Sequence, residues 1–427
     1  MSALPEKEPA ETGEQRLSPA ILETLPGQDE TWSEKGIFSP VFVRLLATNA
    51  AFGFSVSTFY LLPKHLAVSF AATPGQIGLV SGIFSLAAIL SVPFLGRVVD
   101  RLGHRQALIT GFFLMAACAV AFVSVASIGP VLWTLRVLQG LAASVVFAAS
   151  VALVSALAPP GKLGQAMGLS GAASLAMSAV APAIAEPLGA RYGFGYAFAL
   201  AGFAALLGAM VSRGLPKLDR VKALAKTPLA MPTPEIRGVL ATLVLTGAGF
   251  NVVMAFLAPF ALRHGILAVR GFFISYTVAA LGIRVLGGGL TDRLGLRRTA
   301  TLGITLYGIV IAGIGLAGPA HLVPLGFVFG LAHGVLFPAL MALLFEGVAP
   351  HQRTWRAGLS NGVLNLGMLS VSLFGALANH TGLELVFVLA GALVAASAGL
   401  LVPAALRRPF RRAGERSLSG QVLLPPG

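Results

Sequence analysis

The chain has 427 residues, of which 56% are hydrophobic and only 11% are charged, and its formal net charge is +14. Soluble domains carry roughly 25% charged residues, so this composition excludes a set of ordinary soluble domains and predicts a protein that crosses a membrane several times. The basic excess does not indicate a nucleic-acid partner, because the basic residues form short clusters between apolar runs instead of a continuous cationic face.

The first segment, residues 1–38, is polar and acidic. Half of the 16 acidic residues of the chain lie within its first 34 positions. The segment has no apolar run that could act as a signal peptide. We therefore expect a disordered tail on the cytosolic side of the membrane.

From about residue 40 onward, apolar runs of at least 18 residues recur, each long enough for a helix to cross about 30 Å of hydrocarbon. The runs do not alternate as barrel strands do, so each must be a helix that satisfies its own backbone hydrogen bonds. The sequence predicts an all-α membrane protein with twelve transmembrane helices. They are expected at residues 41–62, 76–95, 107–127, 131–156, 165–189, 194–212, 238–262, 271–291, 299–318, 322–345, 357–379 and 384–406.

The basic residues set the expected orientation. With both termini on one side, 24 of the 30 Lys and Arg residues fall on that side, while Arg136 and Arg284 fall inside spans. The four that fall in outer loops are Lys64, Arg191, Arg263 and Arg270. Basic loops stay in the cytoplasm, so we expect both termini there. We expect a multi-pass protein of the plasma membrane, the bacterial inner membrane, that works as a monomer in the lipid bilayer.

The chain also repeats itself. GRVVDRLGHRQ at 96–106 returns as GGLTDRLGLRR at 288–298, and residues 152–171 return in part at 342–361. The offset of roughly 190 residues predicts two six-helix halves in parallel repeat, with a substrate site between them near the midplane. The expected segments are the tail 1–38, the first half 39–212, a cytosolic linker 213–237, the second half 238–406 and a cytosolic tail 407–427.

With these motifs, residues 40–406 resemble the major facilitator superfamily of transporters, and within it the proton-coupled drug and metabolite exporters. The resemblance implies that the duplicated loop gates one face of the protein as the halves rock. We expect Glu346 to pair with an arginine of the second copy. The predicted gating residues are Gly96, Asp100, Arg101, Gly103, Arg105, Gly288, Asp292, Arg293, Gly295, Arg297 and Glu346.

The fourth span carries RVLQG, which is similar to an Arg-x-x-Gln-Gly motif of proton-coupled members. An arginine at this depth is costly and normally faces a cavity or a partner, and Gln139 shares its helix face at i+3. Glu186 lies at the same depth as Arg136. The two could form an ion pair that protonation releases; alternatively, Glu186 is a surface glutamate paired with Arg191. We assign Arg136, Gln139 and Glu186 to proton coupling.

Six further polar residues inside spans are candidates for the substrate cavity. Each could equally serve as a hydrogen bond between helices, and the histidine could be an ordinary core residue. The candidates are Asn49, Tyr60, Asn251, His333, Asn361 and Asn365.

No phosphate-binding loop, metal-ligand spacing or nucleophile–base set is visible, so we expect no cofactor, no metal and no enzyme activity. The predicted function is a secondary active transporter that exports a small organic solute by alternating access, through proton antiport. Two alternatives stay open. One is a proton-coupled or facilitative importer of a small metabolite, and the other is a non-transporting membrane scaffold or receptor on the same fold.

Overall fold

A computed structural model of the protein describes residues 37–159, 162–217, 234–286, 294–346 and 353–401. Within these residues the chain is helical and contains no strand. In the described part of the chain, eleven helical spans are long and apolar enough to cross a membrane. A twelfth helix, α10, is described over 17 residues. The prediction of an all-helical protein with many membrane spans is confirmed.

The helices follow the expected runs closely. The first span is longer than expected, because it continues through two short helices to Phe70. Pro63, near the start of α3, needs no partner for a backbone N–H. The first half contains α2 (Pro40–Thr58), η1 (Phe59–Leu61), α3 (Leu62–Phe70), α4 (Pro74–Leu102), α5 (His104–Ala121), η2 (Phe122–Ser124), α6 (Pro130–Leu157), α7 (Leu163–Tyr192) and α8 (Phe194–Ser212). The second half contains α9 (Pro234–Arg263), α10 (Arg270–Leu286), α12 (Leu296–Ala317), η3 (Pro319–His321), α13 (Leu322–Phe345), α14 (Arg353–Leu369), α15 (Val371–Thr381), α16 (Leu383–Ala396) and α17 (Ala398–Leu401).

The repeated sequence produces repeated packing. In the first half α2 packs on α7, α4 on α6 and α5 on α8; the second half pairs α9 with α14, α10 with α13 and α12 with α16. The repeated loops also share a backbone geometry. Gly103 has φ 79° and Gly295 has φ 80°, a conformation that glycine adopts without a steric penalty.

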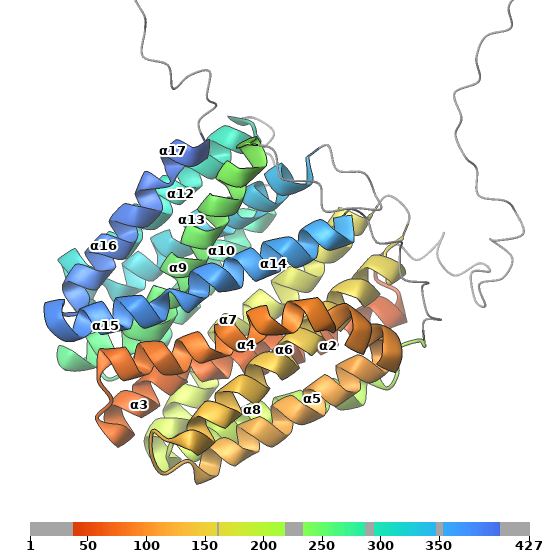
Figure 1. The fold of residues 1–427 in the computed structure, drawn as a ribbon, viewed down its shortest axis with the longest axis horizontal. Helices are drawn as coiled ribbons and strands as arrows, with labels where there is room; N and C mark the ends of the chain where they lie inside the picture. Colours follow the sequence, from red (N-terminus) through yellow and green to blue (C-terminus); the bar gives the residue numbers. More distant parts are fainter. Residues whose placement is uncertain (1–36, 160–161, 218–233, 287–293, 347–352, 402–427) are drawn as a thin grey trace, which may run out of the picture.

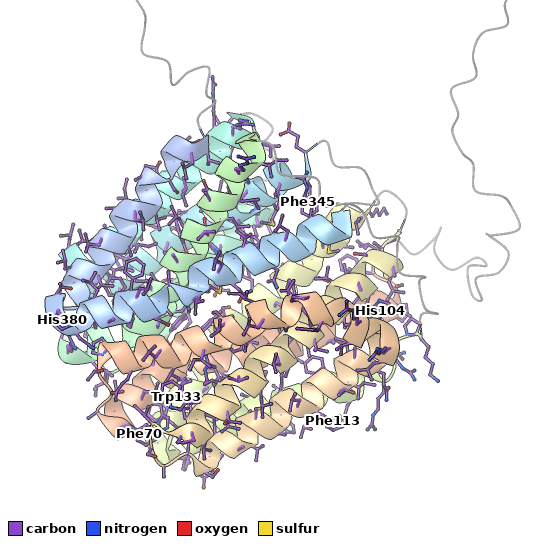
Figure 2. The ribbon with its side chains drawn as sticks, in the orientation of Figure 1. Phe70, His104, Phe113, Trp133, Phe345 and His380 are labelled. Carbon is purple, nitrogen blue, oxygen red and sulfur yellow. The ribbon has the colours of Figure 1, made fainter. Side chains whose placement is uncertain are left out.

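The two halves meet chiefly along three pairs of helices. α4 lies against α14 and α15, and α7 lies against α10. Figure 1 shows the first half in red to yellow-green and the second in green to blue, with α4 beside α14 and α15 where they meet. Figure 2 identifies the two ends of the bundle, with Phe70 and His380 at one end and His104 and Phe345 toward the other. This seam between the halves positions the site described next.

Candidate functional site: a central cavity and its sealed end

A cavity of about 280 Å³ lies between the two halves. The first half contributes lining residues from α2, η1, α3, α4 and α6, and the second half contributes residues from α9 and α14. This is where the parallel repeat places a substrate site. Much of the wall is apolar and includes Phe52, Val56, Phe84, Phe147, Phe250 and Met254.

Arg136 on α6 lines this cavity and is 7% exposed. Its Nε donates a hydrogen bond to the carbonyl oxygen of Val80 at 3.0 Å, and its Nη1 donates to Gln139 Oε1 at 2.5 Å. The guanidinium carbon lies 4.8 Å from the centre of the Phe84 ring. The predicted shared face of Arg136 and Gln139 is therefore confirmed. All of these contacts are to neutral groups, so the positive charge keeps no counterion within the described part of the chain.

Four of the six candidate cavity residues line the cavity: Tyr60, Asn251, Asn361 and Asn365. The Tyr60 ring stacks on Phe273, with the ring centres 5.6 Å apart. On α14, Asn365 Nδ2 donates to the backbone carbonyl oxygen of Asn361 at 2.9 Å and to its side-chain Oδ1 at 3.4 Å. These groups place polar atoms on walls that are otherwise largely apolar.

The other two candidates lie elsewhere. Asn49 is buried where α2 meets α6 and α7, and its side-chain oxygen accepts a hydrogen bond from Ser150 Oγ at 2.6 Å. His333 lies within the second half, with Nδ1 3.0 Å from Tyr276 Oη. Neither is among the residues that line the cavity. The apolar runs predict how deep each residue lies in its span. They do not predict how each helix is rotated, and the rotation decides which side chains face the cavity.

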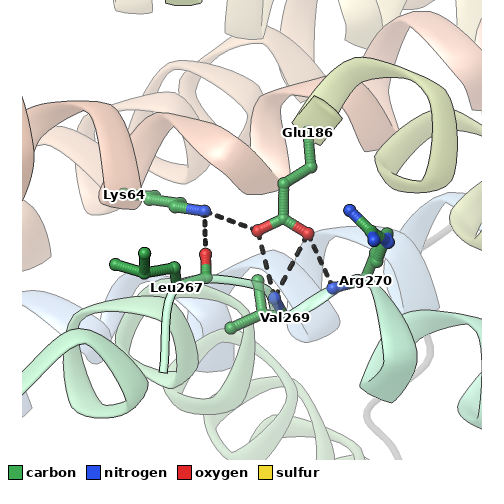
Figure 3. Close-up of polar contacts among 5 residues, drawn as sticks. All are labelled: Lys64, Glu186, Leu267, Val269 and Arg270. Carbon is green, nitrogen blue, oxygen red and sulfur yellow. Dashed lines mark hydrogen bonds and ion pairs between the residues drawn. The ribbon is translucent and has the colours of Figure 1, made fainter. Parts of the chain in front are cut away.

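Glu186 and Lys64 form a buried ion pair at one end of the cavity, shown in Figure 3. Lys64 Nζ lies 2.6 Å from Glu186 Oε1, and the lysine also donates to the carbonyl oxygen of Leu267. The carboxylate accepts the backbone N–H of Val269 at 3.0 Å and that of Arg270 at 2.8 Å. Both ionic groups belong to the first half, and both bind backbone atoms of the second. We call these five residues the latch.

The latch corrects two expectations about Glu186. The carboxylate does not pair with Arg136, and it is not a surface group paired with Arg191, since it is only 2% exposed. A similar depth in the membrane does not decide which residue Glu186 pairs with. The rotation of α7 points its side chain toward Lys64 and the start of α10. The positive end of that helix favours a carboxylate.

Close backbone packing seals the same end. Gly75 N donates to Asn379 Oδ1 at 2.9 Å, and Ser372 Oγ donates to the carbonyl oxygen of Gly78 at 3.2 Å. A Cβ added at Gly78 would lie 2.6 Å from the Val371 carbonyl oxygen, closer than real Cβ atoms come. We call this end, which contains the latch and Gly78, the sealed end.

The opposite end, which carries the repeated arginines, is called the basic end. Arg105 donates to the Leu215 carbonyl oxygen at 3.4 Å, and Arg297 donates to that of Leu401 at 3.4 Å. Neither contact crosses to the other half, because Leu215 closely follows α8 of the first half and Leu401 belongs to the second half, as Arg297 does. No described atom lies within 4 Å of a Cβ built at Gly96. The described arginine contacts therefore do not join the halves in this state.

The predicted gating motif is only partly described. Gly96, Gly103, Gly295, Arg101, Arg105 and Arg297 are described, and Arg101 is exposed. Gly288, Asp292 and Arg293 lie outside the described residues, as does the side chain of Asp100. Glu346 is exposed at the end of α13. Its pairing with an arginine of the second copy stays a prediction.

Sequence reasoning missed Lys64. It was counted among the basic residues of the outer loops, whereas the helical span continues to Phe70 and buries it. The signal was present, because apolar residues flank Lys64 and His65 on both sides in LLPKHLAV. The argument applied to Arg136, that a charge inside an apolar span needs a partner, would have identified it.

Comparison with known proteins agrees with this architecture. The family model of the Major Facilitator Superfamily matches residues 45–320 and 272–425. The peptide transporter POT in complex with sulfate has 14% sequence identity and a TM-score of 0.71, covering 86% of this chain and 95% of that one. The inward-open xylose transporter XylE from E. coli has 16% identity and a TM-score of 0.69, with 84% and 95% covered.

A third similar structure is that of the human organic anion transporter MFSD10 (TETRAN). It has 17% identity and a TM-score of 0.65, and the match covers 85% of this chain and 99% of that one. At such identities the solved structures show the shared fold alone, while the family model matches most of the chain. The chain therefore belongs to the Major Facilitator Superfamily and has its transporter fold.

Proposed function

We propose that this protein is a secondary active transporter that exports a small amphipathic organic solute by alternating access, in exchange for protons. The observation that supports this function is the central cavity between the halves, which is closed at one end by the latch and the glycine seam. A cavity closed on one side is one of the two states that alternating access requires.

We place the basic end in the cytoplasm and the sealed end outside, in the plasma membrane of a bacterium. This orientation follows from the excess of Lys and Arg in the loops of one side. Arg97, Arg101 and Arg105 lie at that end in the first half, and Arg297 and Arg298 in the second. In this orientation the described state receives solute from the cytosol.

Export then needs the halves to rock about the cavity. The backbone contacts at Gly75 and Gly78 separate, and the basic end closes through the repeated gating loops. The ion pair of the latch can stay within the first half during this motion, because the second half supplies only backbone atoms to it. Solute leaves at the end that has opened.

We assign proton coupling to Glu186, and we assign contact with the solute in the cavity to Arg136 and Gln139. When the sealed end opens, Glu186 loses the Val269 and Arg270 amides and is exposed to the outer medium, where it takes up one proton. The proton stays on Glu186 while the halves rock back, and it leaves through the cavity to the cytosol once the basic end is open. The restored carboxylate then pairs with Lys64 again and holds the sealed end closed. One proton enters for each solute that leaves.

The test uses everted membrane vesicles, in which the outer side of the protein faces the lumen. We expect a fluorescent amphipathic solute to accumulate inside when the lumen is made acidic, and an ionophore that collapses the pH gradient should abolish this accumulation. Glu186→Gln should lose the response to the gradient but still bind solute. Accumulation driven by the opposite pH gradient, with an alkaline lumen, would support the importer. The absence of any flux would support a scaffold or receptor.

A further inference from the structure

We infer that the solute is an organic anion, with one carboxylate or similar oxyanion head on an apolar body. This inference rests on the proposed function, since it names the chemical class that the central cavity carries. Two observations support it. The cavity holds the positive charge of Arg136, and none of the described residues that line the cavity carries a negative charge to neutralise it.

Arg136 supplies the cationic contact. A guanidinium has five N–H groups in a planar fork that matches a carboxylate. The described contacts engage the Nε of Arg136 and one N–H of its Nη1, with Val80 and Gln139 as acceptors. Nη2 donates to no residue in the described part of the chain, although Arg136 lines the cavity. The guanidinium is therefore held in place and retains free donors.

No acid among the described residues that line the cavity competes for this charge. Among the described lining residues, Arg136 is the one charged group. The acid nearest to mid-span in the sequence, Glu186, is engaged by Lys64 and two backbone amides in the latch. Arg136 is only 7% exposed, and a buried cation is costly unless it is paired. An anionic solute would therefore provide the counterion that the cavity lacks.

The walls indicate the rest of the molecule. Phe52, Phe147, Phe250 and Met254 surround the cavity with apolar surface. The amides offer less to a ligand, because Asn251 Nδ2 already donates to the Met368 carbonyl oxygen at 2.7 Å. Small-molecule sites are typically apolar, with a few polar groups that fix orientation. An oxyanion at Arg136 with an apolar body along the phenylalanines satisfies both features.

The experiment compares three probes that share one ring system and differ only in the head group: naphthoate, naphthamide and naphthylmethylamine, substituted at the same ring position. Binding to the purified full-length protein in detergent is measured by equilibrium dialysis. We expect naphthoate to bind at least ~10-fold more tightly than the amide, since a hydrogen bond to a charged group is worth about that factor or more. The amine should bind most weakly.

Arg136→Gln should remove the preference for naphthoate, and Arg136→Lys should restore part of it through its charge. Arg284→Gln is the matched control, because it removes an arginine from α10 that does not line the cavity. Its preference should equal that of the unmodified protein. The comparison of head groups in the unmodified protein needs no variant, so a poorly folded Arg136→Gln does not weaken the test.

A protein that binds none of the probes, or that binds the amide or the amine as tightly as naphthoate, contradicts the inference. Such a result leaves the proposed function intact if vesicles still move a neutral or cationic solute. Conversely, selective binding of naphthoate without flux across vesicles would support the anion site and overturn the transport proposal.

Discussion

The two ends of the seam between the halves are built from different contacts. At the sealed end, backbone at Gly78 nearly touches α15, and the latch joins Lys64 and Glu186 to backbone atoms of the other half. At the basic end, a Cβ built at Gly96 would meet no described atom within 4 Å apart from its chain neighbours and the nearby backbone of its own helix. Arg105 binds the carbonyl oxygen of Leu215, which closely follows α8, and Arg297 binds that of Leu401 in its own half. In the proposed transport cycle, the contacts at the sealed end are therefore the ones that must break when the halves rock.

The chemistry of the latch suits a contact that has to open. A buried ion pair gains little net stability, because removing two charges from water costs about as much as their attraction returns. Here the pair stays with one half and binds only backbone groups of the other. Opening the seam rehydrates both charges, which offsets the lost hydrogen bonds. The sealed and open states can therefore lie within a few kcal/mol of each other.

The largest effect is expected from Glu186→Leu, which leaves Lys64 buried without its partner. Breaking a buried pair in this way costs about 3–5 kcal/mol, enough to shift the protein toward the state that is open at the sealed end. The readout is alkylation of Ser81→Cys, which lines the cavity, by a membrane-impermeant maleimide added outside cells. The background is Cys118→Ser, because Cys118 is the only native cysteine. We expect faster labelling.

Two variants sharpen this result. Arg270→Ala is the control, since the latch uses only the backbone N–H of Arg270, and its labelling rate should not change. Adding Lys64→Met to Glu186→Leu removes both charges and should reverse most of the increase. If Glu186→Leu labels no faster than the parent protein, the latch does not hold the sealed end.

A smaller effect is expected from Gly78→Val, which tests the backbone contribution to the same end. Its Cβ would meet the Val371 carbonyl oxygen at 2.6 Å, and backbone on both sides has little room to move. Overpacking of this kind costs about 1–3 kcal/mol, so labelling at Ser81→Cys should again rise. Gly96→Val on the same helix should not raise it, because no described atom lies within 4 Å of that Cβ. Equal rates for both variants would mean that the close packing at Gly78 is not needed for sealing.

Much of the fold could be predicted from sequence, because the bilayer allows few solutions. Apolar runs of fixed length must be helices, and the repeated DRLG motif placed equivalent loops in the two halves. Gly103 and Gly295 indeed share one backbone conformation. The same reasoning put Arg136 and Gln139 on one face, where they form a hydrogen bond. Local spacing along a single helix is sufficient for such inferences.

The partners of Glu186 and the position of Asn49 could not be predicted in the same way. Hydropathy gives the depth of a residue in the membrane but not the rotation of its helix, and the rotation decides which neighbour a side chain meets. Glu186 also binds backbone amides at Val269 and Arg270. Every residue except proline has a backbone N–H, so residue types do not reveal which backbone amides a carboxylate will bind. Identifying the latch therefore required a three-dimensional structure.

The smallest effect is expected from Asn49→Ala, which separates packing inside one half from contacts along the seam. Asn49 is bonded to Ser150 and lies near Ser170, both in its own half, so its environment should stay fixed while the halves rock. Hydrogen bonds between membrane helices average about 0.6 kcal/mol. We therefore expect a slightly lower unfolding free energy in mixed micelles and unchanged labelling of Ser81→Cys. Asn251→Ala is the matched comparison, because Asn251 lines the cavity and its loss should alter solute affinity. Faster labelling in Asn49→Ala would show that the first half does not move as a rigid body. Opening of the sealed end would then involve motion within the first half as well as motion between the halves.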